Sequence, residues 1–181
     1  MARQARGFLA AGTYHATGRS TGPIPLFTDD EECKKFCELL RRVATRHGWV
    51  ILAFCVMTTH YHVLIYVPDE ALQPGMKRLN WSYARWFNAR RGRSGHLFGE
   101  RYYCVRIETD GHMMSALRYI ARNPVTAGLC VRAADWRWSS YRRLIELDNS
   151  FPFVNVEPLR AYFGTDRRRA TALIRQFVED D

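Results

Sequence analysis

The pattern of apolar and polar positions along the 181-residue chain predicts four strands separated by helices. Alternating or almost wholly apolar runs indicate strands over residues 12–19, 49–57, 60–67 and 97–107. Apolar residues three or four positions apart indicate helices from a capping box at 28–31 to Gly48, and over 75–91, 110–123, 136–147 and 157–178. We expect the third of these helices to end before Pro124, because proline disfavours the helical region for its predecessor.

The order of these elements predicts the fold class. Only Thr58 and Thr59 separate the second and third strands, so these strands form a hairpin and lie antiparallel. The order strand, helix, strand, strand, helix, strand, helix is typical of an α+β ferredoxin-like sandwich, an antiparallel sheet with helices packed on it. We predict one such domain over residues 1–147 and a C-terminal helical extension over 148–181.

The amino-acid composition indicates which class of molecule the protein binds. The chain has 27 Lys and Arg against 18 Asp and Glu, a net charge of +9, which favours a polyanion such as nucleic acid. No apolar run approaches the ~20 residues needed to cross a bilayer, and no signal-peptide pattern follows the basic N-terminus, so we expect a cytoplasmic protein without a membrane partner. Five scattered cysteines without a CxxC motif suit reduced thiols.

Two histidines open the third predicted strand. Side chains alternate between faces along a strand, so His60 and His62 point to one side and Tyr61 to the other. Neutral imidazole is a common ligand of first-row metals, so the pair supplies half of a metal site. Without further ligands, the pair is equally compatible with two polar residues at a strand entry.

The predicted helix over residues 110–123 carries a second polar group. At 100° per residue, Tyr119, Asn123 and His112 share a flank of its apolar face. From there a phenol and an amide could reach a site on the sheet. The alternative is that Tyr119 half-buries its ring and Asn123 only ends the helix. Tyr83, by contrast, belongs to an apolar stripe and is predicted to be core.

Together these segments resemble a known family. His60-Tyr61-His62 resembles the HUH motif of single-tyrosine transposases, and Tyr119 to Val125 resembles the nucleophile segment of their REP-associated branch. The resemblance covers residues 12–142 and includes the segments His15-Ala16-Thr17-Gly18-Arg19, Gly95-His96-Leu97-Phe98, Arg101-Tyr102, Ala127-Gly128-Leu129 and Trp138-Ser139-Ser140-Tyr141. Thr58-Thr59 departs from the proline and asparagine usual before the first histidine.

The resemblance implies a metal-dependent endonuclease and strand transferase that acts on single-stranded hairpin DNA in DNA transposition. His60, His62 and Asn123 would hold Mg²⁺ or Mn²⁺, and Tyr119 would attack the DNA to form a 5′-phosphotyrosine. Two alternatives remain open: a domesticated DNA- or RNA-binding module without catalysis, and a metallohydrolase that uses bound water. A homodimer and an association with the nucleoid are also considered.

Basic residues interleaved with aromatic ones predict the DNA-binding surface. Arginine pairs with phosphate and exposed rings stack on unpaired bases. The aromatic candidates are Trp81, Trp86, Phe98 and Tyr102. The predicted DNA contacts are Arg19, Arg85, Arg90, Arg91, Arg93, Arg101, His112 and Arg122. The role of His15 is left open.

Overall fold

The computed structural model describes residues 10–22, 24–69, 71–99 and 102–180. It confirms the predicted α+β fold with a four-stranded antiparallel sheet. The first six elements are β1 (Gly12–Arg19), α1 (Asp30–His47), β2 (Val50–Val56), β3 (His60–Val67), α2 (Leu72–Arg90) and β4 (Tyr103–Ile107). The strands lie in the order β2-β3-β1-β4, which places β3 and its two histidines in the interior of the sheet.

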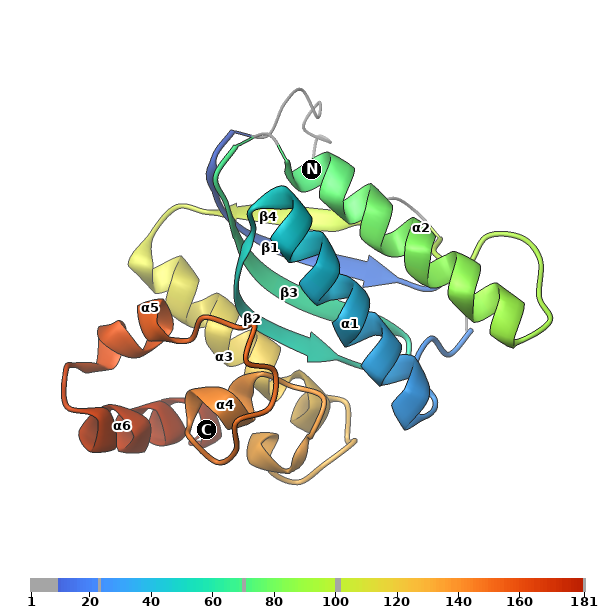
Figure 1. Cartoon of the computed structure of the whole chain (residues 1–181). Coiled ribbons are helices and arrows are strands. Elements are labelled where there is room, and N and C mark those ends of the chain that lie inside the picture. Colours follow the sequence, from blue (N-terminus) through green and yellow to red (C-terminus); the bar gives the residue numbers. More distant parts are fainter. Residues whose placement is uncertain (1–9, 23, 70, 100–101, 181) are drawn as a thin grey trace.

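Helices cover the sheet from both sides (Figure 1). Helices α1 and α2 lie side by side on one face, where the Tyr61 ring packs 4.4 Å from the Phe36 ring and its hydroxyl donates to Asn80. Strand β1 approaches Tyr61 so closely that a Cβ on Gly18 would lie 2.5 Å from the ring. Helix α3 (Asp110–Thr126) packs against β2 and β3 on the opposite face.

The ends of α1 follow from side-chain chemistry at both termini. Asp29 is the N-cap and accepts from the Glu32 amide at 2.9 Å, while the Glu32 carboxylate accepts from the Thr28 amide at 2.7 Å. The capping box therefore begins one residue later than predicted, because the Asp29 carboxylate rather than the Thr28 hydroxyl caps the helix. Gly48, with φ of 65°, ends α1 as predicted.

Two predicted helix limits are wrong, each because of a proline. Helix α2 begins at Leu72, three residues early, because Pro74 lies in the first turn, where its missing amide costs nothing. Helix α3 continues through Pro124 to Thr126, and the Ala127 amide donates to the Asn123 carbonyl at 2.9 Å. Tertiary packing therefore outweighs the local bias against helix before Pro124, which is buried.

The fourth predicted strand is shorter than the pattern suggested. Strand β4 starts at Tyr103 instead of residue 97. Phe98 forms only an isolated bridge with Ser20, and the Thr21 amide donates to the Leu97 carbonyl at 2.9 Å. The segment around Leu97 thus pairs beyond the end of β1 and does not extend β4 itself.

The predicted helix over residues 136–147 is mostly a sheet-edge contact. Only α4 (Tyr141–Leu144) is helical, and a 3-10 turn (Ala133–Asp135) precedes it. The Val56 amide donates to the Trp138 carbonyl at 2.9 Å, and the Ser140 amide to the Phe54 carbonyl at 3.0 Å. These bonds satisfy backbone groups on the outer edge of β2, which a helix at the same position would leave unpaired.

The predicted helix over residues 157–178 is divided in two. Its parts are α5 (Glu157–Arg160), a 3-10 turn (Ala161–Phe163) and α6 (Arg167–Glu179). Gly164, with φ of 112°, follows the 3-10 turn in a conformation that other residues rarely adopt. The long apolar period therefore belongs to two short helices joined at a glycine.

The C-terminal segment packs on the same core as the sheet. Val154, Leu159 and Ile174 are buried in the same hydrophobic cluster as the strands, and the Asn155 amide donates to the Ile51 carbonyl at 2.8 Å. A domain boundary at residue 147 stays a prediction. None of the helices in the described ranges is both long and apolar enough to cross a membrane.

Candidate active site

Strand β3 presents both histidines on the face that α3 covers, opposite Tyr61. The His60 and His62 rings lie 5.0 Å apart between centroids. His62 is buried at 4% exposure, whereas His60, at the start of the strand, is partly exposed. The alternation of side chains along the strand therefore orients the pair as predicted.

Strand β1 adds two side chains to this pair. Thr17 lies directly opposite His62 in the β1–β3 register, with its Oγ1 2.9 Å from His62 Nδ1. His15 Nε2 lies 3.0 Å from the same nitrogen. Sequence analysis left His15 open and missed Thr17. Their alternate positions on one strand were visible, but only the sheet order shows that β1 is the neighbour of β3.

Helix α3 brings the predicted tyrosine and amide to the same place. The Tyr119 ring lies 5.3 Å from the His62 ring and 5.9 Å from the His15 ring, with 55% of the residue exposed. Asn123 is buried and its side chain hydrogen-bonds with His60. The structure thus gathers His60, His62, Tyr119 and Asn123 around one point, with the phenol accessible from solvent.

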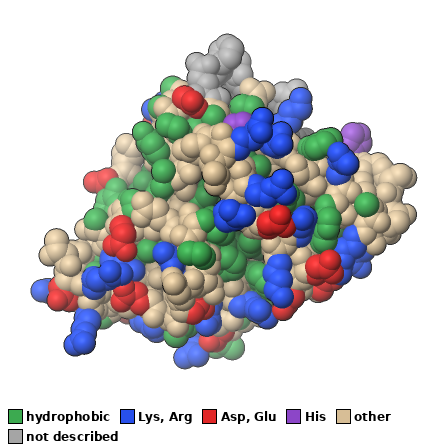
Figure 2. All heavy atoms as spheres, in the orientation of Figure 1, with side chains coloured by type: hydrophobic (Ala, Val, Ile, Leu, Met, Phe, Trp, Pro, Cys, Tyr) green, Lys and Arg blue, Asp and Glu red, His purple; other side chains and the backbone are tan. Residues whose placement is uncertain are grey.

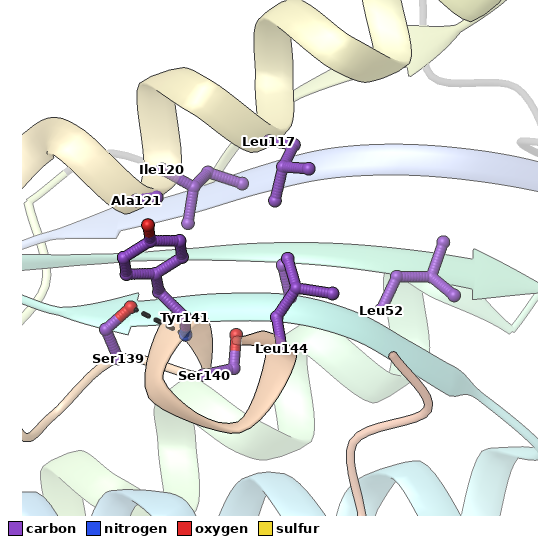
Figure 3. A pocket seen from close by; sticks show the side chains of 9 residues that line it. Leu52, Leu117, Ile120, Ala121, Ser139, Ser140, Tyr141 and Leu144 are labelled. Carbon is purple, nitrogen blue, oxygen red and sulfur yellow. Dashed lines mark hydrogen bonds between the residues drawn. The ribbon is translucent and has the colours of Figure 1, made fainter. Parts of the chain in front are cut away.

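The apolar side of α3 fixes where Tyr119 stands. In Figure 3, Leu117 and Ile120 point from α3 toward β2 and toward Tyr141 and Leu144 of the following segment. A cavity of only about 10 Å³ remains between them, so the contact is tightly packed. Rigid packing of this kind holds a side chain on the neighbouring flank of the helix in one position.

The C-terminal end of α6 holds α3 from its other side. Arg118 Nε donates to the Phe177 carbonyl at 2.9 Å, and Arg122 Nη1 donates to the Val178 carbonyl at 3.1 Å. These guanidinium groups satisfy carbonyls that the end of a helix leaves unpaired. The residues on either side of Tyr119 in the helical turn are therefore anchored to the C-terminal segment.

Burial keeps the site histidines neutral. The pKa of His62 is lowered to about 3, mainly by burial and to a smaller extent by the nearby His15, His60 and Arg19. Burial and the nearby His112 lower the pKa of His15 to about 4. Burial and the charge of Arg19 also lower the pKa of His60, whereas a hydrogen bond that His60 donates to the Asn123 side chain raises it. Near pH 7 all three rings can offer a nitrogen lone pair.

One buried atom at the site has no hydrogen-bond partner in the described residues. His62 Nε2 is orphaned, whereas His62 Nδ1 is held by Thr17 and His15. An imidazole that ligates a metal through one nitrogen usually hydrogen-bonds through the other. The donor chemistry of His60, His62 and Asn123 therefore fits a divalent ion, with Nε2 of His62 as the free ligand atom.

The ligand set depends on the Asn123 amide as its third donor. Nowhere in the described ranges do three or more His, Cys, Asp or Glu side chains form a group arranged to hold a metal. Two imidazole nitrogens and one amide oxygen would leave coordination positions for phosphate oxygens. This ligand set stays a prediction.

The predicted DNA contacts lie on different sides of the sheet. Arg19 is exposed and pairs with His60 in the β1–β3 register, so it stands beside the site, and His112 lies near His15. Arg85 and Arg93 come from α2 and the loop after it, on the opposite face, where they pack over the Trp81 and Phe87 rings.

Three other predicted contacts already have partners within the protein. Arg90 Nη1 and Arg91 Nη2 lie 3.0 Å and 2.6 Å from Oε1 of the buried Glu32, and Arg122 holds the end of α6. DNA contacts by these residues stay predictions and would compete with the internal bonds. Arg101 lies outside the described residues.

Tyr103, which the sequence predicts to pack or stack on a strand, lies at the site although it was not among the aromatic candidates for DNA binding. It pairs with Thr17 in the β1–β4 register, so its ring is on the histidine face, and 65% of it is exposed. Tyr102, its predicted counterpart, is buried, as are Tyr61 and Tyr83. An exposed ring beside the histidines can stack on an unpaired base.

Comparisons with known proteins identify the family of the chain and a solved structure of similar fold. Among solved structures, a REP-associated tyrosine transposase bound to a REP hairpin matches with a TM-score of 0.67 at 19% identity, over 81% of this chain and 86% of that one. A protein of Deinococcus radiodurans R1 described as a transposase matches with a TM-score of 0.47 at 21% identity, over 66% and 95%. No curated protein sequence matches significantly. The family of IS200-like transposases matches residues 12–123, and the chain belongs to this family.

Proposed function

We propose that this transposase nicks and rejoins single-stranded DNA through a covalent bond to Tyr119. The observation that carries the proposal is the exposed Tyr119 ring, 5.3 Å from His62, whose buried Nε2 has no partner in the described residues. An exposed phenol thus lies next to an imidazole whose buried ligand atom is unused. A packing role alone would bury the phenol and pair the imidazole.

The proposed cleavage step is a transesterification. The Tyr119 oxygen forms a bond to the scissile phosphorus, and the bond to the 3′ oxygen breaks, which leaves a 5′-phosphotyrosine and a free 3′-hydroxyl. The phenol proton leaves to solvent, and the 3′ oxygen takes one up. Because the phosphotyrosine keeps the phosphodiester energy, a second 3′-hydroxyl can reverse the step without ATP.

His60, His62 and Asn123 would hold Mg²⁺ or Mn²⁺ beside the phenol. Bound there, the ion would neutralise charge on the scissile phosphate, which matters because a phenol is a weak nucleophile at pH 7. The neutral histidines suit this role, since protonated imidazole offers no lone pair. Asn123 would also orient His60 through their hydrogen bond.

The proposed substrate is single-stranded DNA that carries a hairpin. A similar structure is of a transposase bound to a REP hairpin, and the basic chain suits such a polyanion. Arg19 and His112 lie where they can contact the scissile strand, and Tyr103 can stack on one of its bases. A homodimer and nucleoid association remain part of this proposal.

The two alternative functions make different predictions. A domesticated binding module would need neither the exposed phenol nor a free imidazole nitrogen. A metallohydrolase would need the metal but not the Tyr119 hydroxyl. The covalent intermediate therefore separates all three.

The test is a search for a protein–DNA adduct on a denaturing gel. Fluorescent hairpin DNA with single-stranded flanks, drawn from genomic repeats, is incubated with and without Mg²⁺ or Mn²⁺. We expect a metal-dependent adduct with wild type that Tyr119→Phe and His62→Ala abolish. Tyr83→Phe, which removes a buried phenol on the other face, is the control and should keep it. Tight hairpin binding without any adduct would favour the binding module.

A further inference from the structure

A groove between α1 and α2 lies on the face of the sheet away from Tyr119. It has a volume of about 790 Å³ and is lined by both helices. Figure 2 views the molecule from this side and shows Lys and Arg side chains gathered over α1 and α2. Arg85, one of the predicted DNA contacts, lines this groove, whereas His15, His60, His62, Tyr119 and Asn123 do not.

The lining of the groove is basic throughout. It includes six Lys and Arg and no Asp or Glu: Lys35, Arg41, Arg42, Arg46, Arg78 and Arg85. Lys35 and Arg42 share one acidic partner, Glu38, whose single negative charge offsets only one of the two positive charges. Within the described ranges the other four have no acidic partner. Their charge is uncompensated, and the pKa of nearby His47 is lowered by burial and by Arg46 and Arg78.

An exposed indole stands among these charges. Trp81 is 58% exposed, which is unusual for so large an apolar side chain, and the Arg85 guanidinium lies 4.8 Å from its ring centroid. The partly buried Trp86 also lines the groove. Rings that alternate with arginines form the kind of surface that binds unpaired bases by stacking and their phosphates by charge.

We propose that the α1–α2 groove is a second binding site for single-stranded nucleic acid. From Lys35 to Arg46 the groove follows α1 for about 16 Å, at 1.5 Å per residue. This length suits roughly five stacked nucleotides at 3.4 Å each. The site lies on the far side of the sheet from Tyr119, so it would hold a stretch of strand other than the one at the phenol.

A bound single strand would explain why Trp81 is exposed in the groove, whereas a bound duplex would not. Arginines alone would serve a duplex backbone, but paired bases cannot stack on a side chain without leaving their helix. The exposed face of Trp81 is therefore the discriminating feature. The proposal needs no catalysis and stands whether or not Tyr119 forms an adduct.

The test measures binding of a fluorescent oligothymidylate of about eight nucleotides, long enough for the estimated groove. We expect Trp81→Ala to weaken binding roughly 5- to 150-fold, the equivalent of one lost stacking contact, and Trp81→Phe to recover part of the loss. Neutralising Arg78 as Arg78→Gln should make the slope of log K against log salt shallower by about 0.7. Lys77→Gln, which neutralises an exposed neighbour outside the groove, is the matched control.

Cross-linking locates the strand. With 4-thiothymidine in the oligonucleotide, we expect a cross-linked peptide that contains Trp81, in wild type and in Tyr119→Phe alike. If wild type forms no Tyr119 adduct but keeps this cross-link, only the proposed function is refuted. If Trp81→Ala and Arg78→Gln bind as tightly as Lys77→Gln, or if duplex DNA competes equally, the groove is not a single-strand site.

Discussion

The hydrogen bond between Thr17 and His62 allows a direct test of how the site is organised. Thr17 Oγ1 and His15 Nε2 lie 2.9 Å and 3.0 Å from His62 Nδ1, while His62 Nε2 is buried without a partner in the described part of the chain. If the proton of neutral His62 is on Nδ1, it donates to Thr17 or His15 and leaves the Nε2 lone pair free. We therefore expect Thr17→Val to loosen the orientation of the ring and its choice of tautomer.

The size of the effect follows from what is lost. One buried hydrogen bond is removed, which costs about 1–3 kcal/mol in stability when a partner is left unsatisfied. Residual bonding to His15 places the change toward the lower end. Removing a hydrogen-bond partner behind a ligating histidine usually costs ~10- to 100-fold in metal affinity. We expect a loss of this order for Mn²⁺ with Thr17→Val.

Two measurements check this prediction. Calorimetric titration with Mn²⁺ gives the affinity, and long-range ¹H–¹⁵N NMR gives the tautomer of His62 without any metal. Thr13→Val is the matched control, since Thr13 lies on the same face of β1 but opposite Tyr66 instead of a histidine. Equal Mn²⁺ affinities of the two variants, or a His62 proton on Nε2 in wild type, would refute the reasoning.

Three further predictions concern stability. Glu32→Gln should lower the melting temperature, because it leaves Arg90 and Arg91 without their buried partner, a loss of ~3 kcal/mol or less given their partial exposure. Gly18→Ala should destabilise by more than the ~1 kcal/mol typical of mutations, as measured by urea unfolding, because the added Cβ meets the Tyr61 ring. In EDTA, the free energy of unfolding should fall from about pH 6.5 toward pH 4, by up to ~1.4 kcal/mol per pH unit and per group. The folded chain, with the pKa values of His15 and His62 at about 4 and about 3, binds fewer protons there than the unfolded chain. A flat profile between these pH values would contradict the lowered pKa values.

The elements with a strong local pattern were predictable. β1 and β3 match their predicted limits, and Gly48 ends α1 as expected, because alternation and a left-handed glycine are properties of the local sequence. Some limits failed for local reasons, such as Pro74 in the first turn of α2, but others depend on distant residues. Residues 138–140 carry a helical spacing, yet they bond to the edge of β2, more than 80 positions earlier.

The candidate site likewise has residues that the local sequence predicts and residues that it does not. His60 and His62 are two residues apart on one strand, so their side chains must share a face. Tyr119 and Asn123 are four residues apart on α3, so they lie beside each other on the helix. His15 and Thr17 lie at the site only because β1 is the neighbour of β3 in the sheet, and the strand order cannot be predicted from a local sequence pattern. The internal partners of Arg90, Arg91 and Arg122 were invisible for the same reason, since each lies more than 50 positions away.

The two halves of the site are supported by separate parts of the molecule. His60 and His62 stand on an interior strand whose other face is locked by Tyr61 against Phe36 and Asn80, so they cannot shift without disturbing the core. Tyr119 stands on a helix that is held by β2 on one side and, through Arg118 and Arg122, by the end of α6 on the other. Loosening α6 would therefore move the phenol while leaving the histidines in place. The C-terminal segment, although it lies outside the matched family region, therefore helps to position Tyr119, the proposed nucleophile.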